Sequence, residues 1–219
     1  MPKQAPDYPT ARPFIPAKPT LPRLKLAAKT CEGCDLYKRG TQTVFGEGPS
    51  KATVMFVGEQ PGDQEDLAGK PFVGPAGGIL DKALAEAAIP REEVYVTNAV
   101  KHFKWEPRGK RRIHSKPSAR QVAACRPWLE EEIAVVKPKI IVCLGATAAA
   151  ALLGPKFRLT QHRGEMLKTE WAPAVTATVH PSSIFRHPDK AERERAFAMF
   201  AEDMKTIAKA LRGLKREKV

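Results

Sequence analysis

The feature that most constrains the fold of this chain is an alternation of short apolar runs with amphipathic stretches. Three runs rich in β-branched residues occupy residues 52–58, 93–98 and 139–145. A short apolar run bounded by turn residues is typical of a buried strand. Apolar residues at helical spacing follow in residues 77–88 and 118–136. Alternating strands and helices predict an α/β fold with a mainly parallel sheet.

The carboxyl-terminal half continues this alternation. We expect helices at residues 146–153 and 190–211, a strand at residues 174–179 and a shorter strand near residues 166–167. The full set predicts a three-layer α/β/α fold, with helices on both faces of a central, mainly parallel sheet. Such sheets bind ligands at the carboxyl ends of their strands, so the functional site is expected in the loops that follow them.

Length and composition fit one globular domain. The chain has 219 residues, of which 42% are hydrophobic. Residues 1–24 hold many prolines and few large apolar residues, so we expect an extended N-terminal arm before a domain at residues 25–219. No apolar run approaches the roughly 20 residues that span a bilayer, and no signal-peptide pattern begins the chain. The sequence therefore predicts a cytoplasmic protein with no membrane contact, and no heptad pattern contradicts a monomer.

The charge of the chain favours a polyanionic partner. Lysine and arginine number 37 against 24 acidic residues, a formal net charge of +13. Such an excess attracts nucleic acid through electrostatic steering and counterion release. The alternative is a basic tail on a neutral body, because residues 205–218 hold part of the excess. The basic stretch 101–117, which we expect to be a loop, is a candidate DNA-facing surface.

Two of the four cysteines form the pair Cys31-x-x-Cys34. Structural disulfides are rare in cytosolic proteins, so the pair indicates a metal, a cluster or redox chemistry. A redox protein is disfavoured because no thioredoxin-like pattern surrounds the pair. The spacing lets both thiolates face one metal, and two further ligands must then come from elsewhere in the chain.

Three motifs stand where the loops after the predicted strands begin. They are Gly58-Glu-Gln-Pro-Gly62, Thr97-Asn-Ala-Val-Lys-His102 and His180-Pro-Ser-Ser-Ile-Phe-Arg186. With the Cys31 pair and the glycine-rich residues 69–77, this combination resembles the uracil-DNA glycosylase superfamily from about Cys31 to the end of the last helix. It is similar to the family 4 branch, whose members carry a four-iron cluster. The stretch Gly109-Lys-Arg-Arg-Ile-His114 resembles the UdgX subgroup, whose members form a covalent adduct with DNA.

The resemblance implies that uracil is flipped out of the DNA and bound in a pocket. The side-chain amide of Asn98 offers a donor and an acceptor that suit uracil and disfavour cytosine. Phe72 offers an aromatic face for the base. As the glycosidic bond breaks, His180 is expected to donate to uracil O2, and Glu59 to stabilise the sugar cation or position a nucleophile. Taken singly, these residues have ordinary alternatives: a strand-end cap, a core side chain, a loop histidine and a surface acid.

Further residues are expected near the substrate. Gln60, Gly62 and Asp63 lie in the same turn as Glu59, where they are expected to line the base pocket. Arg186 is expected to contact phosphate or the flipped nucleotide. The expected partner is uracil-containing DNA, preferably single-stranded.

His114 is the expected nucleophile of a covalent capture. A neutral imidazole nitrogen is nucleophilic, and the oxocarbenium-like C1′ is a strong electrophile. The resemblance to UdgX implies that His114 replaces water and leaves a stable bond, so that the enzyme does not turn over. One alternative is an ordinary family 4 glycosylase that releases uracil and turns over, with His114 contacting phosphate as Lys110, Arg111 and Arg112 also can. Another is a non-catalytic nucleic-acid-binding protein that uses an iron–sulfur cluster as a sensor.

The resemblance also implies a 4Fe-4S cluster held by Cys31, Cys34, His102 and Cys125. Cys125 matches the last cysteine of the family 4 pattern, and His102 stands where that pattern has its third cysteine. Cys143 lies in a predicted buried strand, where a cysteine is more often a small apolar residue. Ligation by all four cysteines is the simplest alternative, and zinc also accepts three cysteines and one histidine.

Overall fold

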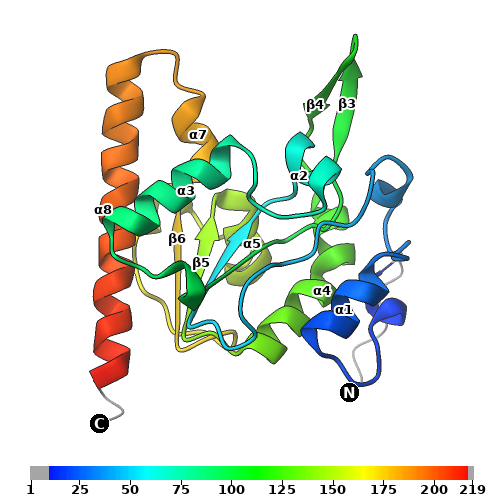
Figure 1. Ribbon diagram of the computed structural model, residues 1–219, viewed down its shortest axis with the longest axis horizontal. Helices are drawn as coiled ribbons and strands as arrows, with labels where there is room; N and C mark the ends of the chain where they lie inside the picture. The colour runs from blue at the N-terminus through cyan, green and yellow to red at the C-terminus, as the bar shows by residue number, and fades with distance from the viewer. Residues whose placement is uncertain (1–9, 217–219) are drawn as a thin grey trace.

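The computed structural model describes residues 10–216 and centres on a four-stranded parallel sheet (Figure 1). Its strands are β1 (Val54–Gly58), β2 (Val94–Asn98), β5 (Ile140–Leu144) and β6 (Ala174–Thr178), in the order β2-β1-β5-β6. Every residue of β1, β2 and β5 is buried. Burial on both faces accounts for their continuous apolar runs, and the predicted parallel sheet is confirmed.

Helices cover both faces of the sheet and give the expected three layers (Figure 1). On one face lie α3 (Pro75–Glu86) and α8 (Lys190–Arg216), whose apolar side chains pack with those of the sheet in one core cluster. On the other face lie α4 (Ala119–Val136) and α5 (Ala146–Leu153), which contribute to a second cluster. The sheet is therefore held between two apolar cores, and its strand ends are left to form loops.

Several further elements are short. Among them are the helices α2 (Asp63–Ala68), α6 (Leu159–His162) and α7 (Pro181–Phe185), and the 3-10 turns η1 (Arg12–Phe14), η2 (Asp35–Lys38) and η3 (Arg91–Glu93). Leu167 pairs with Val175 in a single antiparallel bridge, so the strand expected near residues 166–167 is reduced to one residue pair. Within residues 10–216, no helix is long and apolar enough to cross a membrane.

The N-terminal segment differs from the expected extended arm of residues 1–24. Helix α1 (Leu21–Ala28) begins inside that range, with the Thr20 side chain accepting a hydrogen bond at its start. Leu24 is fully buried, and the backbone N–H of Ala11 donates to the Ala124 carbonyl of α4. The few apolar residues of this segment gain burial from α4, a distant part of the chain. Residues 1–9 of the expected arm lie outside the described residues.

The basic stretch expected to be a loop contains a β-hairpin. Strands β3 (Trp105–Arg108) and β4 (Arg111–His114) pair antiparallel around a two-residue turn, and the hairpin projects from the body in Figure 1. Gly109 opens the turn with φ 58°, a left-handed conformation that favours glycine in two-residue hairpin turns. His114 therefore lies at the base of a regular hairpin.

Candidate active site at the carboxyl ends of the strands

Asn98 ends β2 in a buried position with its side-chain amide free. The residue is 3% exposed, and no hydrogen bond to its side-chain amide is found among the described residues. The strand beside it ends at Gly58, where an added Cβ would lie 2.3 Å from Asn98 Oδ1 and 2.9 Å from the Phe72 ring. An amide with no protein partner at the end of a strand is available to donate to and accept from a ligand. Asn98 is thus an open binding group at the sheet edge.

Phe72 is held beside Asn98 by an unusual backbone conformation. Its φ of 57° is left-handed, which is uncommon for a bulky residue and is found at sites where surrounding structure enforces it. The Phe72 backbone packs closely against Gly77, where an added Cβ would lie 1.8 Å from the Phe72 carbonyl oxygen. The ring lies roughly parallel to that of His180, with centroids 6.2 Å apart. Phe72 and His180 therefore flank the same space.

His180 is a neutral hydrogen-bond donor in this geometry. It precedes α7, and its Nδ1 accepts the Ser182 backbone N–H at 3.1 Å. Burial lowers the pKa of His180 to about 4, with the charges of Arg186 and His114 acting in the same direction. A neutral ring whose Nδ1 accepts a hydrogen bond carries its proton on Nε2. The Nε2–H is therefore available to a substrate.

Glu59 uses its two carboxylate oxygens for two different partners. Oε1 lies 3.2 Å from His114 Nε2, and Oε2 accepts a hydrogen bond from the Thr147 hydroxyl. Burial acts to raise the pKa of Glu59, but the hydrogen bonds from His114 and Thr147 outweigh it, so the pKa lies below its ordinary value. The carboxylate is thus ionised and oriented at neutral pH.

Two residues of the Glu59 turn hold the hairpin in place. The Gln60 amide donates to the carbonyls of Lys104 and Ser115 and accepts the Lys104 N–H, each at 3.1 Å, so it joins the two ends of the hairpin. The Arg112 guanidinium lies 2.6 Å from a carboxylate oxygen of Asp63. Gln60 and Asp63 therefore hold the hairpin that carries His114.

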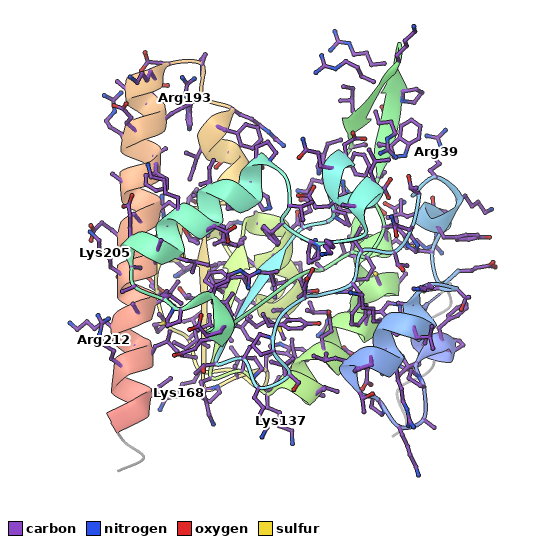
Figure 2. The ribbon with its side chains drawn as sticks, in the orientation of Figure 1. Arg39, Lys137, Lys168, Arg193, Lys205 and Arg212 are labelled. Atoms are coloured by element: carbon purple, nitrogen blue, oxygen red, sulfur yellow. The ribbon has the colours of Figure 1, made fainter. Side chains whose placement is uncertain are left out.

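The hairpin is anchored on its other side as well. Arg112 also binds the fully buried Asp66 of α2 at 2.6 Å. The Trp105 indole N–H donates to the Arg39 carbonyl at 2.9 Å, and Figure 2 shows Arg39 beside the base of the hairpin. Residues near the Cys31 pair and residues of α2 thus fix the position of His114.

A buried ion pair holds the backbone of the Asn98 loop. The Lys101 ammonium donates to the Asn98 carbonyl and the Thr97 hydroxyl and pairs with Glu132 of α4. Both charged side chains are at most 1% exposed. Glu132 also accepts the Tyr95 hydroxyl. Removing one member of such a pair would leave the other charge buried without a partner, which is costly. Because Lys101 also donates to the Asn98 carbonyl, the pair holds the loop backbone in one arrangement.

Three of the cysteines gather in one apolar cluster. Cys31 and Cys125 are buried there together, and Cys34 packs against them. Cys31 accepts the Trp128 indole N–H and Cys125 accepts the Lys101 backbone N–H, both at 3.2 Å. Burial raises the pKa of Cys125 to about 12 and, with the charges of Cys31 and Asp35 acting in the same direction, that of Cys34 to about 11.

His102 lies next to this group. Its side chain and Cys31 line the same cavity of about 130 Å³. Burial lowers the pKa of His102 to about 4, which keeps the ring neutral at pH 7. Cys143 lies apart, fully buried in the sheet core, where burial alone raises its pKa to about 12.

Comparison with known proteins decides the family. The sequence model of the Uracil DNA glycosylase superfamily matches residues 45–205, a range that includes the whole sheet and the loops after its strands, and that begins after Cys31 and Cys34. The chain belongs to this superfamily. It is 39% identical over 160 residues to the Type-4 uracil-DNA glycosylase of Thermotoga maritima, which covers 73% of this chain and 80% of that protein.

Two further relatives have similar sequence identity and coverage. The Type-4 uracil-DNA glycosylase of Pyrobaculum aerophilum is 35% identical over 188 residues, covering 82% of this chain and 92% of that protein. That of Archaeoglobus fulgidus is 36% identical over 181 residues, covering 79% of this chain and 87% of that protein. The similarity therefore extends over most of each protein.

In this uracil-DNA glycosylase fold, the predicted site residues divide into two groups. One group meets at the strand ends: Asn98, Phe72, His180, Glu59 and His114. The other surrounds it. Gly62 precedes α2 as its N-cap, where its N–H donates to Glu65, and Arg186 follows α7 as an exposed residue whose charge acts on His180.

The donor set of Cys31, Cys34, Cys125 and His102 fits a metal or cluster by its chemistry. Three thiols and one neutral imidazole, the ligands of zinc and iron, lie in and beside one apolar cluster. N–H groups already point at two of the sulfurs, as in sites where sulfur becomes thiolate. Within the described residues, however, no group of three or more such side chains already surrounds a metal position.

A fourth loop of the site was not predicted from the sequence. The predicted site has loops after three strands, but the loop after β5 also reaches the centre through Thr147, which binds Glu59. Gly145 has φ 90°, and an added Cβ would lie 3.1 Å from the His180 Cβ. Residues 139–145 form an apolar run ended by glycine, like the run at residues 52–58. Because parallel strands end at the same edge of a sheet, this pattern was the one sequence signal that could have predicted the loop.

Proposed function

We propose that this chain is a uracil-DNA glycosylase that removes uracil from DNA and is then linked covalently through His114 to C1′ of the abasic site. Relatives named Type-4 uracil-DNA glycosylases support the first part. The observation that carries the second part is the 3.2 Å contact between His114 Nε2 and Glu59 Oε1. In this contact a nucleophile, His114, meets a base, Glu59. Both lie near the strand ends where the Asn98 amide has no protein partner among residues 10–216.

Base selection is assigned to Asn98 and Phe72. The Asn98 amide is buried and has no partner in the described chain, so it is free to donate to uracil O4 and accept from N3–H. Cytosine presents a donor and an acceptor in the opposite order, and a buried mismatch of this kind is strongly disfavoured. The Phe72 ring provides a stacking surface for a base flipped out of the strand. We propose single-stranded DNA as the preferred substrate, because its bases need no unpairing.

Bond cleavage is assigned to His180 and Glu59. As the C1′–N1 bond breaks, its electron pair moves onto uracil and negative charge develops on O2. The neutral His180 ring, protonated on Nε2, donates a hydrogen bond to that oxygen. The ionised Glu59 carboxylate stabilises the positive charge that develops on the sugar.

Capture is assigned to His114. Nε2 transfers its proton to Glu59 and forms a bond with C1′, in place of the bond to uracil. The product is a neutral N-substituted imidazole, which is a poor leaving group, so the protein remains on the DNA. Gln60 and Arg112 hold the hairpin that presents His114, and Arg186 is assigned a contact with the nucleotide.

A 4Fe-4S cluster is proposed for Cys31, Cys34, His102 and Cys125. When bound, it supplies structural cross-linking of the N-terminal loop, the Asn98 loop and α4. Lys101 lies between this group and Asn98, because its backbone N–H meets Cys125 and its ammonium meets the Asn98 carbonyl. The ligand group and the base pocket are thereby tied to one loop.

The test uses single-stranded DNA with one uracil, incubated with the protein and resolved on a denaturing gel after heating in detergent. We expect a band at the combined mass of protein and DNA. His114→Ala should abolish this band and leave abasic DNA. Abasic DNA without a stable band for the unaltered protein would contradict capture, and intact DNA would contradict uracil removal.

A further inference from the structure

We infer that Thr147 selects the nucleophile, because its hydroxyl fixes the Glu59 carboxylate so that it serves His114 and not water. The inference deepens the proposed function and rests on it. Thr147 acts through Glu59 and is therefore a positioning residue.

The geometry around the Glu59 carboxylate is divided between two loops. Thr147 lies in the first turn of α5 and donates its hydroxyl proton to Oε2, while His114 from the hairpin faces Oε1. Gly145 makes the turn from β5 into α5 and lets His180 approach closely. Each carboxylate oxygen therefore has its own partner.

Water can reach the Glu59 side chain. Its exposed fraction is 21%, and that of His114 is 36%. A carboxylate oxygen that is open to water can orient it and accept its proton as it attacks, and hydrolysis is the ordinary fate of an oxocarbenium-like sugar. A site that forms a histidine adduct must therefore keep this carboxylate from activating water.

The Thr147 hydroxyl contributes to this by taking one acceptor site of Oε2 and fixing the orientation of the carboxylate, so that Oε1 faces His114. In capture, the Nε2 proton passes to Oε1, the Nε2–C1′ bond forms, and the C1′–N1 bond breaks with its electron pair leaving on uracil. In hydrolysis, water oxygen would bond to C1′ and its proton would pass to a free carboxylate oxygen. With Oε2 already accepting from Thr147, the remaining oxygen faces His114.

The test compares Thr147→Val, which keeps the shape without the hydroxyl, with Thr147→Ser, which keeps the hydroxyl. The control is Thr206→Val on α8, an exposed residue whose hydroxyl donates to the Glu202 backbone carbonyl. Each protein is mixed with single-stranded uracil DNA, and the rates of adduct and abasic-DNA formation are measured from pH 4 to pH 8. Circular dichroism confirms that each variant is folded.

We expect Thr147→Val to slow adduct formation about tenfold and to raise the share of abasic DNA. The acidic limb of its rate profile should move to higher pH, because Glu59 loses a hydrogen bond that lowers its pKa. The other groups facing Glu59 are His114 from the hairpin and His180 before α7, and both are unchanged in these variants. Thr147→Ser and Thr206→Val should behave like the unaltered protein.

Two results would overturn the inference. One is a Thr147→Val variant with an unchanged adduct rate, product ratio and pH profile. The other is a loss of activity that Thr147→Ser shares, which would indicate a purely structural role. If the unaltered protein itself yields only abasic DNA, the proposed capture by His114 fails. The assignment of Thr147 to Glu59 is then still tested by the pH profile of uracil release.

Discussion

The chemistry of His180 follows from where its ring lies. Burial beside Phe72 and Gly145 disfavours the imidazolium, and the Ser182 N–H determines which nitrogen carries the proton. The sequence indicated that a histidine in this loop acts as a donor. It could not indicate the tautomer, because that depends on a backbone N–H positioned by the first turn of α7.

The neutral state of His180 makes stability depend on pH. Its pKa is about 4 in the folded protein and near the ordinary 6.5 in the unfolded chain, so the unfolded chain binds a proton more readily as pH falls below 6.5. The free energy of unfolding should therefore fall between pH 6.5 and pH 4, by up to about 3 kcal/mol from this residue. Urea unfolding at pH 7 and pH 4.5 measures this loss. His180→Asn should lose less stability on acidification than the unaltered protein, and equal losses would contradict a buried neutral ring.

At the scale of elements, the hairpin determines where His114 lies. The sequence of this stretch reads as a loop because basic residues dominate it and no apolar alternation marks its strands. Its regular structure comes from contacts that are distant in sequence: Gln60 joins its ends, and Arg112 reaches the buried Asp66. Local sequence patterns cannot predict contacts between residues so distant in sequence. The buried strands were predictable because their apolar runs are continuous.

Arg112→Ala tests whether anchoring the hairpin is needed for capture. The substitution leaves Asp66 buried with only its backbone partner, the Thr41 N–H, and frees the strand that carries His114. We expect adduct formation to slow about tenfold or more, since small displacements of a reacting group are costly, with a smaller effect on uracil release. Rates are measured at saturating DNA. Arg111→Ala is the control, because Arg111 lies next to Arg112 in β4 and is exposed. Equal effects of the two substitutions would mean that Arg112 serves only as a positive charge.

At the scale of the whole molecule, the region around Cys31, Cys34 and Cys125 joins the N-terminal segment to the sheet. The fold of the central domain was predictable from alternating runs, but the docking of residues 10–24 was not. That segment has few apolar residues, and Ala11 and Leu24 become buried only because α4 lies against them. The four expected ligands lie where this segment, the Asn98 loop and α4 meet.

The ligand assignment separates Cys143 from the other three cysteines. Cys143→Ser changes a residue of the sheet core and should leave iron content and visible absorbance unchanged in the purified protein. His102→Ala should lower both or make them decay faster, because one donor is lost. Iron analysis and absorbance spectra check both expectations. Bleaching by Cys143→Ser with an unaffected His102→Ala would show that the assignment is wrong.

The most direct test of the central claim is the mass of the peptide that contains residue 114. The protein is incubated with uracil-containing single-stranded DNA, both polymers are digested, and the peptides are analysed by tandem mass spectrometry. We expect a deoxyribose-derived mass on the His114 imidazole, together with one free uracil per adduct. An unmodified His114 peptide alongside free uracil and abasic DNA would contradict capture by this residue.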